Sequence, residues 1–169
     1  MDFFEAITTR HSVRKYTGEK LTQVEWDMVF KAGFSAPSAH NLQPWHFIRI
    51  DQVDKLEELA QAHPYAKMLP QAGGAILVCA DIAVQEYIGF AVEDCSAVMQ
   101  NMLVTLNGLG LGGLWIGVYP IEELIDTMRK IFSLPENILP IGIIAVGHKV
   151  ASRKPIDKYN PEKIHVNGW

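Results

Sequence analysis

The chain has 169 residues, of which 49% are hydrophobic and 20% charged, and its formal net charge is −4. These values are typical of a globular protein and exclude a disordered or collagen-like chain. The acidic balance argues against a broad phosphate-tracking surface of the kind that nucleic-acid-binding proteins present, so any anion site must be local. A chain of this length forms one domain that buries about 70% of its unfolded surface. We therefore expect a single domain over residues 1–169.

The cysteines and the N-terminus narrow the class of protein further. Cys79 and Cys95 lie in apolar stretches without Cys-x-x-Cys spacing, which favours buried free thiols over a disulfide framework or a zinc site. The first ten residues carry Asp2 and Glu5 where a secretory signal would be basic, and they contain no long apolar core. We expect a cytoplasmic protein.

The first part of the chain predicts helices and one strand. Acidic side chains at the start and basic ones at the end indicate a short helix over residues 2–9, as the helix dipole prefers. Thr22 and Glu25 form a capping-box pattern that begins a second helix, running to about residue 35. After a break in periodicity, residues 46–50 indicate a strand and residues 51–63 an amphipathic helix.

The second part alternates strands and helices. Residues 73–81 form an apolar run without alternation, which indicates a strand buried on both faces. Residues 85–109 predict one long helix that charged and amide side chains interrupt, so we expect it in the core or between subunits and not in a membrane. Residues 113–119 and 138–148 predict strands on either side of a helix over residues 121–132. By default, this alternation favours a parallel doubly wound sheet.

A glycine-rich segment, Gly108–Gly113, matches the letters of the dinucleotide fingerprint G-x-G-x-x-G. That fingerprint needs a strand before it and a helix after it, because the pyrophosphate must meet the N-terminus of the helix. This segment leaves a predicted helix and enters a predicted strand. We interpret it as a helix-terminating turn whose glycines adopt positive φ.

A cationic cluster stands out in the segment TTRHSVRKY, residues 8–16, which contains Arg10, His11, Arg14 and Lys15. One interpretation is solvated cations at the end of a helix. The other is a phosphate site, in which two arginines bind oxygens bidentately and Ser12 adds a hydrogen bond. Each charge-assisted bond contributes about 1.5–3 kcal/mol, so two or three fall short of the roughly 8 kcal/mol of micromolar binding. A phosphate site would therefore need an apolar partner group.

A loop with amide side chains, APSAHNLQPWHF over residues 36–47, could supply that group. It places Ser38, Asn41 and Gln43 beside Trp45, and amides carry the donors and acceptors that match the edge of a heterocycle. Alternatively, its Ser and Asn only cap turns while the Trp fills the core. The residues alone leave both interpretations open.

Other chemistry has less support in the sequence. His40, His46 and His148 lack metal-ligand spacing, and no serine lies in a nucleophile elbow with partners for a triad. Glu93 and Asp94 are neighbours on a predicted helix, so they point about 100° apart and do not easily share a substrate. A structural role is expected for at least one of them.

Four segments together resemble motifs of the nitroreductase family of FMN-dependent oxidoreductases. RHSVRKY resembles the N-terminal phosphate motif of the family, and SAPSAHNLQPWHF resembles its Pro-Ser-x-x-Asn-x-Gln-Pro-Trp loop. GGLWIGVY resembles the ring-facing strand, and VGHKVASRKP the closing basic segment. The matches follow the order of the family and span nearly the whole chain.

The resemblance implies a set of cofactor contacts in each region. The FMN phosphate and ribityl chain would be held by Arg10, Ser12 and Arg14, with His11 beside them and Arg153 returning from the C-terminal segment. The ring system would meet a loop of the other subunit, formed by Pro37, Ser38, Ala39 and Asn41 and supported by Gln43. Ile116 and Gly117 would face the ring, with the Gly117 N–H near flavin N5 and Lys67 near the pyrimidine edge.

The resemblance also implies an α+β fold and a dimer. The family has a mixed central sheet flanked by helices, and its intertwined homodimer exchanges a C-terminal segment. Residues 155–169 would form that arm and dock on the partner subunit. Tyr159, Ile164, Val166 and Trp169 fit this role because a solvated tail is seldom so apolar.

The implied activity is a ping-pong oxidoreductase reaction. Hydride passes from NADH or NADPH to flavin N5 and on to an acceptor such as a quinone or a nitroaromatic, with no side-chain acid or base required in the first half-reaction. Two alternatives stay open: a flavin-binding or redox-sensing dimer without efficient turnover, and a flavin-modifying or dehalogenating member of the superfamily. Position 39 is Ala where many members carry a hydroxyl, and the longer central insertion of some members is missing, so the acceptor and the nucleotide preference stay open.

Overall fold

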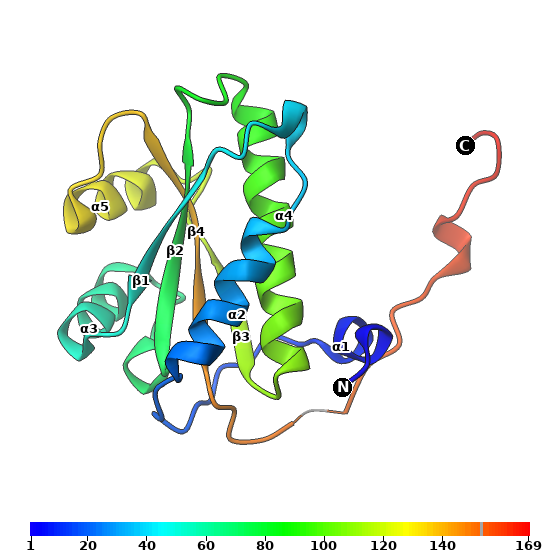
Figure 1. Ribbon diagram of the computed structural model, residues 1–169, viewed down its shortest axis with the longest axis horizontal. Helices are drawn as coiled ribbons and strands as arrows, with labels where there is room; N and C mark the ends of the chain where they lie inside the picture. Colours follow the sequence, from blue (N-terminus) through cyan, green and yellow to red (C-terminus); the bar gives the residue numbers. More distant parts are fainter. Residues whose placement is uncertain (153) are drawn as a thin grey trace.

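A four-stranded sheet runs through the centre of the computed structural model, which describes residues 1–152 and 154–169 (Figure 1). The strands are β1 (Trp45–Ile50), β2 (Gly74–Asp81), β3 (Gly112–Gly117) and β4 (Ile138–Gly147). Their spatial order is β1-β2-β4-β3, and every pairing between them is antiparallel. The expected α+β class is confirmed.

The strand directions differ from the parallel sheet that alternating strands and helices suggest. That default fails because β1 pairs directly with β2, its neighbour in sequence, in the antiparallel direction, so no crossover to a parallel strand is made. In the described residues, parallel pairing is confined to the bridge between Ser12 and Gly113 at the outer edge of β3. The mixed character expected of the sheet therefore rests on this one bridge.

Helices cover both faces of the sheet. Figure 1 shows α2 (Gln23–Phe34) and α4 (Ile88–Gly108) on one face, and α3 (Val53–Ala62) and α5 (Glu122–Phe132) on the other. Alternate residues of β2 enter two different cores, Ile76 and Val78 with α4, Leu77 and Cys79 with α3 and α5. This two-sided burial explains why the strand shows a continuous apolar run in the sequence.

The helix ends follow the sequence signals closely. Thr22 Oγ1 accepts a hydrogen bond from the Glu25 N–H at 3.3 Å and the Thr22 N–H donates to Glu25 Oε2 at 2.7 Å, so the capping box is confirmed. Helix α4 ends at Gly108 and is followed by Gly110 at φ 80°, which confirms the helix-terminating turn. It begins at Ile88, later than expected, because the chain first turns and the Gln85 N–H bonds to the Asp81 carbonyl. In the described part of the chain, no helix is long and apolar enough to cross a membrane.

Both cysteines are free and buried, as predicted. Burial raises the pKa of Cys79 to about 12 and also raises the pKa of Cys95 to about 12. Thiols with such values remain protonated at neutral pH and are poor nucleophiles.

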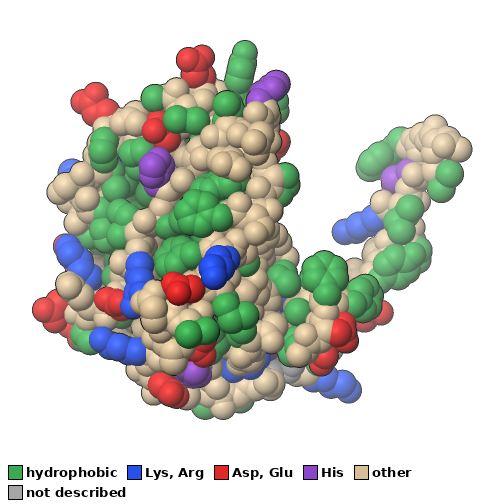
Figure 2. All heavy atoms as spheres, viewed as in Figure 1, with side chains coloured by type: hydrophobic (Ala, Val, Ile, Leu, Met, Phe, Trp, Pro, Cys, Tyr) green, Lys and Arg blue, Asp and Glu red, His purple; other side chains and the backbone are tan. Residues whose placement is uncertain are grey.

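The N-terminus lies near the C-terminal end of α4, where helix α1 (Phe3–Thr9) packs against that helix (Figure 1). The C-terminal segment first passes α1, and its last residues then extend away from the body (Figures 1 and 2). Its short 3-10 turn is Pro161–Lys163, and its apolar side chains, including Ile164, Val166 and Trp169, are exposed. Exposed apolar groups on an extended segment are typical of a surface that meets another molecule.

Candidate functional site

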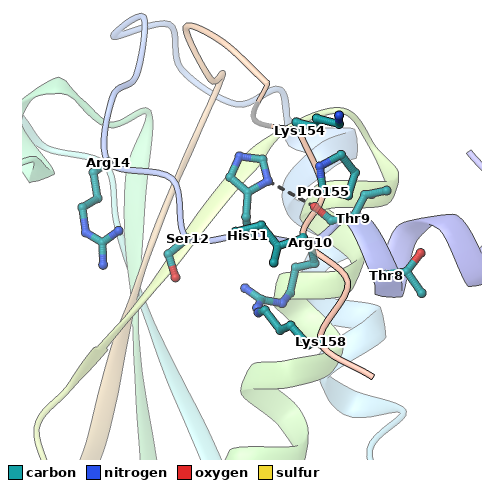
Figure 3. Close-up of a pocket in the computed structure, with 10 residues that line it drawn as sticks. Thr8, Thr9, Arg10, His11, Ser12, Arg14, Lys154, Pro155 and Lys158 are labelled. Atoms are coloured by element: carbon teal, nitrogen blue, oxygen red, sulfur yellow. Dashed lines mark hydrogen bonds between the residues drawn. The ribbon is translucent and has the colours of Figure 1, made fainter. Parts of the chain in front are cut away.

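The cationic cluster lines a cavity of about 250 Å³ between the end of α1 and the C-terminal segment (Figure 3). Arg10, His11, Ser12 and Arg14 all contribute to it, as the phosphate interpretation requires. The remaining lining residues are Thr8, Thr9, Lys154, Pro155, Ile156 and Lys158. The cavity is therefore predominantly polar and cationic.

Backbone bonds on both sides hold the cluster in place. The Val13 N–H donates to the Gly113 carbonyl at 3.0 Å, and the Thr17 N–H donates to the His148 carbonyl at 2.9 Å. Val13 and Tyr16 are buried between these bonds, whereas Ser12 and Arg14 are exposed. The segment thus lies along the edge of β3 with its apolar side chains inward and its polar side chains toward the cavity.

Tyr16 anchors this segment from within. Its hydroxyl donates to the Val13 carbonyl at 2.8 Å. Burial raises the pKa of Tyr16 above its ordinary value, and the nearby charge of Arg14 opposes this shift only in part. The phenol is therefore a neutral structural group.

Two lysines that the sequence reasoning did not include, Lys154 and Lys158, join the cationic cluster. Figure 3 shows Lys158 and Arg10 on one side of Ser12 and Arg14 on the other. Lys154 stands next to the predicted Arg153, which lies outside the described residues. The basic residues at positions 153, 154 and 158 were the available signal, but no local sequence pattern shows that this segment packs beside α1.

No Lys or Arg of this cavity forms a salt bridge within the described residues. Among residues 1–152 and 154–169, the salt bridges are Arg49–Asp51 and Lys55–Glu58, both far from the cluster in sequence. His11 Nδ1 lies 3.1 Å from the Thr9 carbonyl, so this ring nitrogen carries the proton and donates. An array of cations that form no salt bridge among the described residues favours a bound anion.

A second cavity, of about 400 Å³, adjoins the first, and Arg14 lines both. One wall is the segment that follows α3, with Pro64, Tyr65, Lys67 and Met68; the other is the end of β3, with Leu114, Trp115, Ile116 and Gly117. Most of these side chains are apolar. A cationic hollow that continues into an apolar one matches a ligand with a phosphate at one end and an aromatic group at the other.

Gly117 leaves the second cavity open on one side. A Cβ built at this position would meet no heavy atom within 4 Å, and its φ is not in the left-handed region. Neither packing nor backbone conformation within the described residues therefore requires glycine. A bare backbone in a cavity wall allows a ligand to approach closely.

Lys67, which the resemblance places near the pyrimidine edge of the flavin, lines the same cavity. Its ammonium group donates to the Ala60 carbonyl at 2.9 Å, which ties it to the end of α3.

The described residues hold no group of three or more His, Cys, Asp or Glu that could bind a metal ion.

The loop over residues 37–43 lies elsewhere, at the end of the sheet where α4 begins (Figure 1). None of Pro37, Ser38, Ala39, Asn41 and Gln43 lines either cavity of its own chain. His40, Asn41 and Gln43 adopt left-handed φ of 54°, 55° and 50°. Each such residue costs on the order of 1 kcal/mol, which persists only where surrounding contacts enforce it.

Hydrogen bonds from nearby side chains enforce this loop conformation. Asp94 Oδ1 accepts from the Ala39 N–H at 2.8 Å, and Ser38 Oγ accepts from the Gln43 N–H at 2.9 Å. Asp94 is buried while Glu93 is exposed, which confirms that the two acids point apart. Asp94 Oδ2 is buried and has no hydrogen-bond partner among the described residues. The sequence reasoning missed the role of Asp94 because its partner is 55 positions away.

Comparison with known proteins gives concordant matches. A model described as the nitroreductase family matches residues 7–72 and 63–148. A protein of Methanothermobacter thermautotrophicus, provisionally described as an NADH dehydrogenase/NAD(P)H nitroreductase, is 38% identical over 169 residues, which cover 100% of this chain and 88% of the relative.

Solved structures match as well. A Bacteroides thetaiotaomicron protein with the same provisional description has a TM-score of 0.94 at 40% identity, and the match covers 99% of this chain and 98% of that one. A provisionally described nitroreductase of Desulfovibrio desulfuricans was crystallised in complex with FMN. It has a TM-score of 0.85 at 26% identity, and the match covers 100% of this chain and 98% of that one.

Proposed function

The chain belongs to the nitroreductase family, and on that basis we propose that it is an FMN-dependent NAD(P)H oxidoreductase whose cofactor lies along the edge of β3. The observation that carries this proposal is the continuity of a cationic cavity with an apolar one through Arg14. The first cavity supplies the charge that a phosphate monoester needs. The second supplies the apolar partner without which phosphate contacts alone would bind too weakly.

The residues present fit FMN at both ends. Arg10, Ser12 and Arg14, with Lys154 and Lys158, would hold the phosphate and the ribityl chain. Ile116, the backbone of Gly117 and the wall formed by residues 64–68 would enclose the ring, and the missing side chain at Gly117 leaves room for it. Lys67 would place positive charge beside the ring, where it favours an anionic reduced form.

Bound FMN supplies the hydride chemistry, accepting from a nicotinamide and returning electrons to a second substrate. The chain supplies position, electrostatics and exclusion of water. Within the described residues, the groups with shifted pKa values are Tyr16, Cys79, Asp81 and Cys95. None of them lines either cavity. This fits a reaction in which no side-chain acid or base is needed in the first half, and we propose a ping-pong sequence with a quinone or nitroaromatic as acceptor.

The proposed active form is a homodimer with two equivalent sites. The loop over residues 37–43 would reach the flavin of the partner subunit, and residues 155–169 would dock on that subunit. A groove of about 830 Å³ supports this arrangement, because Phe4 and Ile7 of α1, Gln100 of α4 and Tyr159 of the arm line it. Phe4 and Tyr159 are exposed in one chain, so a second copy could cover them.

Anaerobic reduction tests the proposal directly. The protein, purified under native conditions and supplied with FMN, is titrated with NADH and separately with NADPH while flavin absorbance is followed, and a quinone or nitroaromatic is then added. Stoichiometric FMN binding, rapid bleaching with at least one nucleotide, and recovery on addition of the acceptor are expected. Absence of FMN binding contradicts the whole proposal. Binding without reduction by either nucleotide supports a flavin-binding or redox-sensing dimer instead.

A further inference from the structure

A buried histidine lies between the two walls of the apolar cavity, and neither the predicted contacts nor the proposed reaction uses it. His63 follows the last residue of α3 and has no exposed surface. The chain leaves it directly into Pro64 and Tyr65, which line one wall of the cavity. A fully buried imidazole requires hydrogen-bond partners, because an unpaired buried polar group is costly.

Both ring nitrogens of His63 bond to backbone atoms. Nδ1 lies 3.2 Å from the Tyr65 N–H, which can only donate, so Nδ1 accepts. Nε2 lies 2.8 Å from the Gly117 carbonyl, which can only accept, so Nε2 carries the proton and donates. The two partners together assign one neutral tautomer.

These two bonds connect opposite walls of the cavity. Tyr65 belongs to the wall that follows α3, and Gly117 ends β3 on the other side. The bond between His63 and Gly117 joins residues that are 54 positions apart in the sequence. His63 therefore sets the spacing between the segment that follows α3 and the end of β3, which are distant in the sequence.

The sheet itself holds the end of β3 loosely. After the Gly117–Gly142 pair, the N–H groups of Val118 and Tyr119 both bond to the Ile141 carbonyl, so the regular ladder ends there. Glycine is also the residue with the greatest backbone freedom. The bond from His63 is thus the side-chain restraint on the Gly117 peptide in the described part of the chain.

We propose that His63 is a positioning residue that holds the Gly117 backbone against the flavin ring and fixes the width of the slot in which the ring lies. This inference rests on the proposed function, because it assigns the ring to the second cavity. Small displacements of groups around a reacting centre can change rates by about 100-fold. The contribution of His63 is expected in the rate of flavin reduction and in the redox potential, as well as in FMN affinity.

The test compares three substitutions with different reach. The amide nitrogen of His63→Gln can occupy the position of Nε2 and still donate to Gly117, whereas the shorter His63→Asn can replace only the Nδ1 acceptor. His63→Leu removes both bonds. The matched controls are His46→Gln, His46→Asn and His46→Leu, because His46 is exposed on β1 and lines neither cavity. Each variant is measured for thermal unfolding, FMN dissociation constant, flavin midpoint potential and anaerobic reduction rate at saturating FMN.

For His63→Leu and His63→Asn, we expect a loss of about 10-fold or more in reduction rate at saturating FMN, together with a shifted midpoint potential. His63→Gln should stay within about 3-fold of wild type, and the His46 variants should not change. The proposal is overturned if all three His63 variants lower the unfolding temperature alone and reach the wild-type potential and rate once saturated with FMN. It is also overturned if Gln and Asn behave alike. Wild-type protein that binds no FMN would instead refute the proposed function, so the two failures are distinguishable.

Discussion

Two regions of the chain carry the flavin contacts implied by the resemblance, and they differ in what surrounds them. Residues 10–14 lie on a cavity of their own chain, which continues along β3. The loop over residues 37–43 lines neither cavity, although specific hydrogen bonds also hold its conformation. Three of its residues are left-handed, and Asp94 holds it through the Ala39 N–H.

This difference suggests that the two regions contact the cofactor in different ways. A cavity lined by cations can bind a ligand in one chain, whereas an ordered, strained loop that lines neither cavity has a shape suited to a surface outside its chain. The contrast therefore supports a site built across two subunits. Each prediction below perturbs one of the two regions and compares the result with the other.

The largest effect on FMN affinity is expected from the cationic region. Arg10→Ala and Arg14→Ala each remove charge-assisted hydrogen bonds worth about 1.5–3 kcal/mol, so each should weaken FMN binding by roughly 10- to 150-fold. Arg14→Ala should be the more severe, because Arg14 lines both cavities. Fluorescence titration of FMN measures the change, and Arg49→Ala, an exposed arginine paired with Asp51, is the control. Unchanged affinity in both variants would leave only the interpretation of solvated helix-end cations.

The second prediction tests whether the two regions belong to different subunits. Ala39→Trp adds bulk to the loop without removing its backbone bond to Asp94, and it should abolish activity in the homodimer. If the loop serves the partner, unfolding and refolding an equal mixture of Ala39→Trp and Arg14→Ala chains should restore about one quarter of the sites, because each mixed dimer has one site free of both changes. Activity per mole of dimer measures the recovery, at an FMN concentration that loads wild-type sites but leaves the Arg14→Ala homodimer unloaded. No recovery, with mixed dimers confirmed by mass, would place both regions in one site of one chain.

The third prediction concerns the anchor of the loop. Asp94→Ala should weaken FMN binding by about 10-fold without a change in the cationic cavity, because the Ala39 N–H loses its acceptor. Asp94→Asn should recover most of that loss, since the amide oxygen still accepts and Oδ2 has no partner to lose among the described residues. Glu93→Ala, exposed beside it, is the control. Equal losses in the Ala and Asn variants would show that the charge of Asp94 matters and the bond does not.

The sequence predicted the elements better than their arrangement. The capping box at Thr22 and the glycine turn after α4 are local, so their signals survive in any context. The direction of strand pairing is not encoded within one strand, because β2 bonds both to β1, its neighbour in sequence, and to β4, the last strand, and both pairings are antiparallel. The default of a parallel sheet failed for that reason.

The site divides in the same way. Arg10, Ser12 and Arg14 lie within five positions, so a sequence pattern brings them together before the fold does. His63 and Asp94 bond to groups more than 50 positions away, and Lys158 lines the first cavity only because the C-terminal segment passes α1. No spacing rule points to these three residues. Sequence reasoning therefore finds cavity-lining residues that lie on one segment and misses residues whose bonding partners are distant in the sequence.

The smallest effect is expected from Tyr16, which anchors the cationic segment as Asp94 anchors the loop. Tyr16→Phe removes the bond to the Val13 carbonyl, worth about 1 kcal/mol, and should lower the unfolding temperature by about 2–4 °C at neutral pH. FMN affinity should fall less than in Asp94→Ala, because the Val13 and Thr17 backbone bonds still hold the segment.

The pH dependence of the difference in unfolding temperature between wild type and Tyr16→Phe gives a sharper measurement. Burial raises the pKa of Tyr16 in the folded chain, so the folded phenol stays neutral where an unfolded tyrosine, with a pKa near 10, ionises. The stability it contributes is present in full below about pH 10 and is lost as the pH rises above that value. The gap in unfolding temperature between wild type and Tyr16→Phe should therefore shrink from pH 9 to pH 11. A constant gap would mean that Tyr16 ionises equally in both states, and that the cationic segment is held by its backbone bonds without the buried phenol.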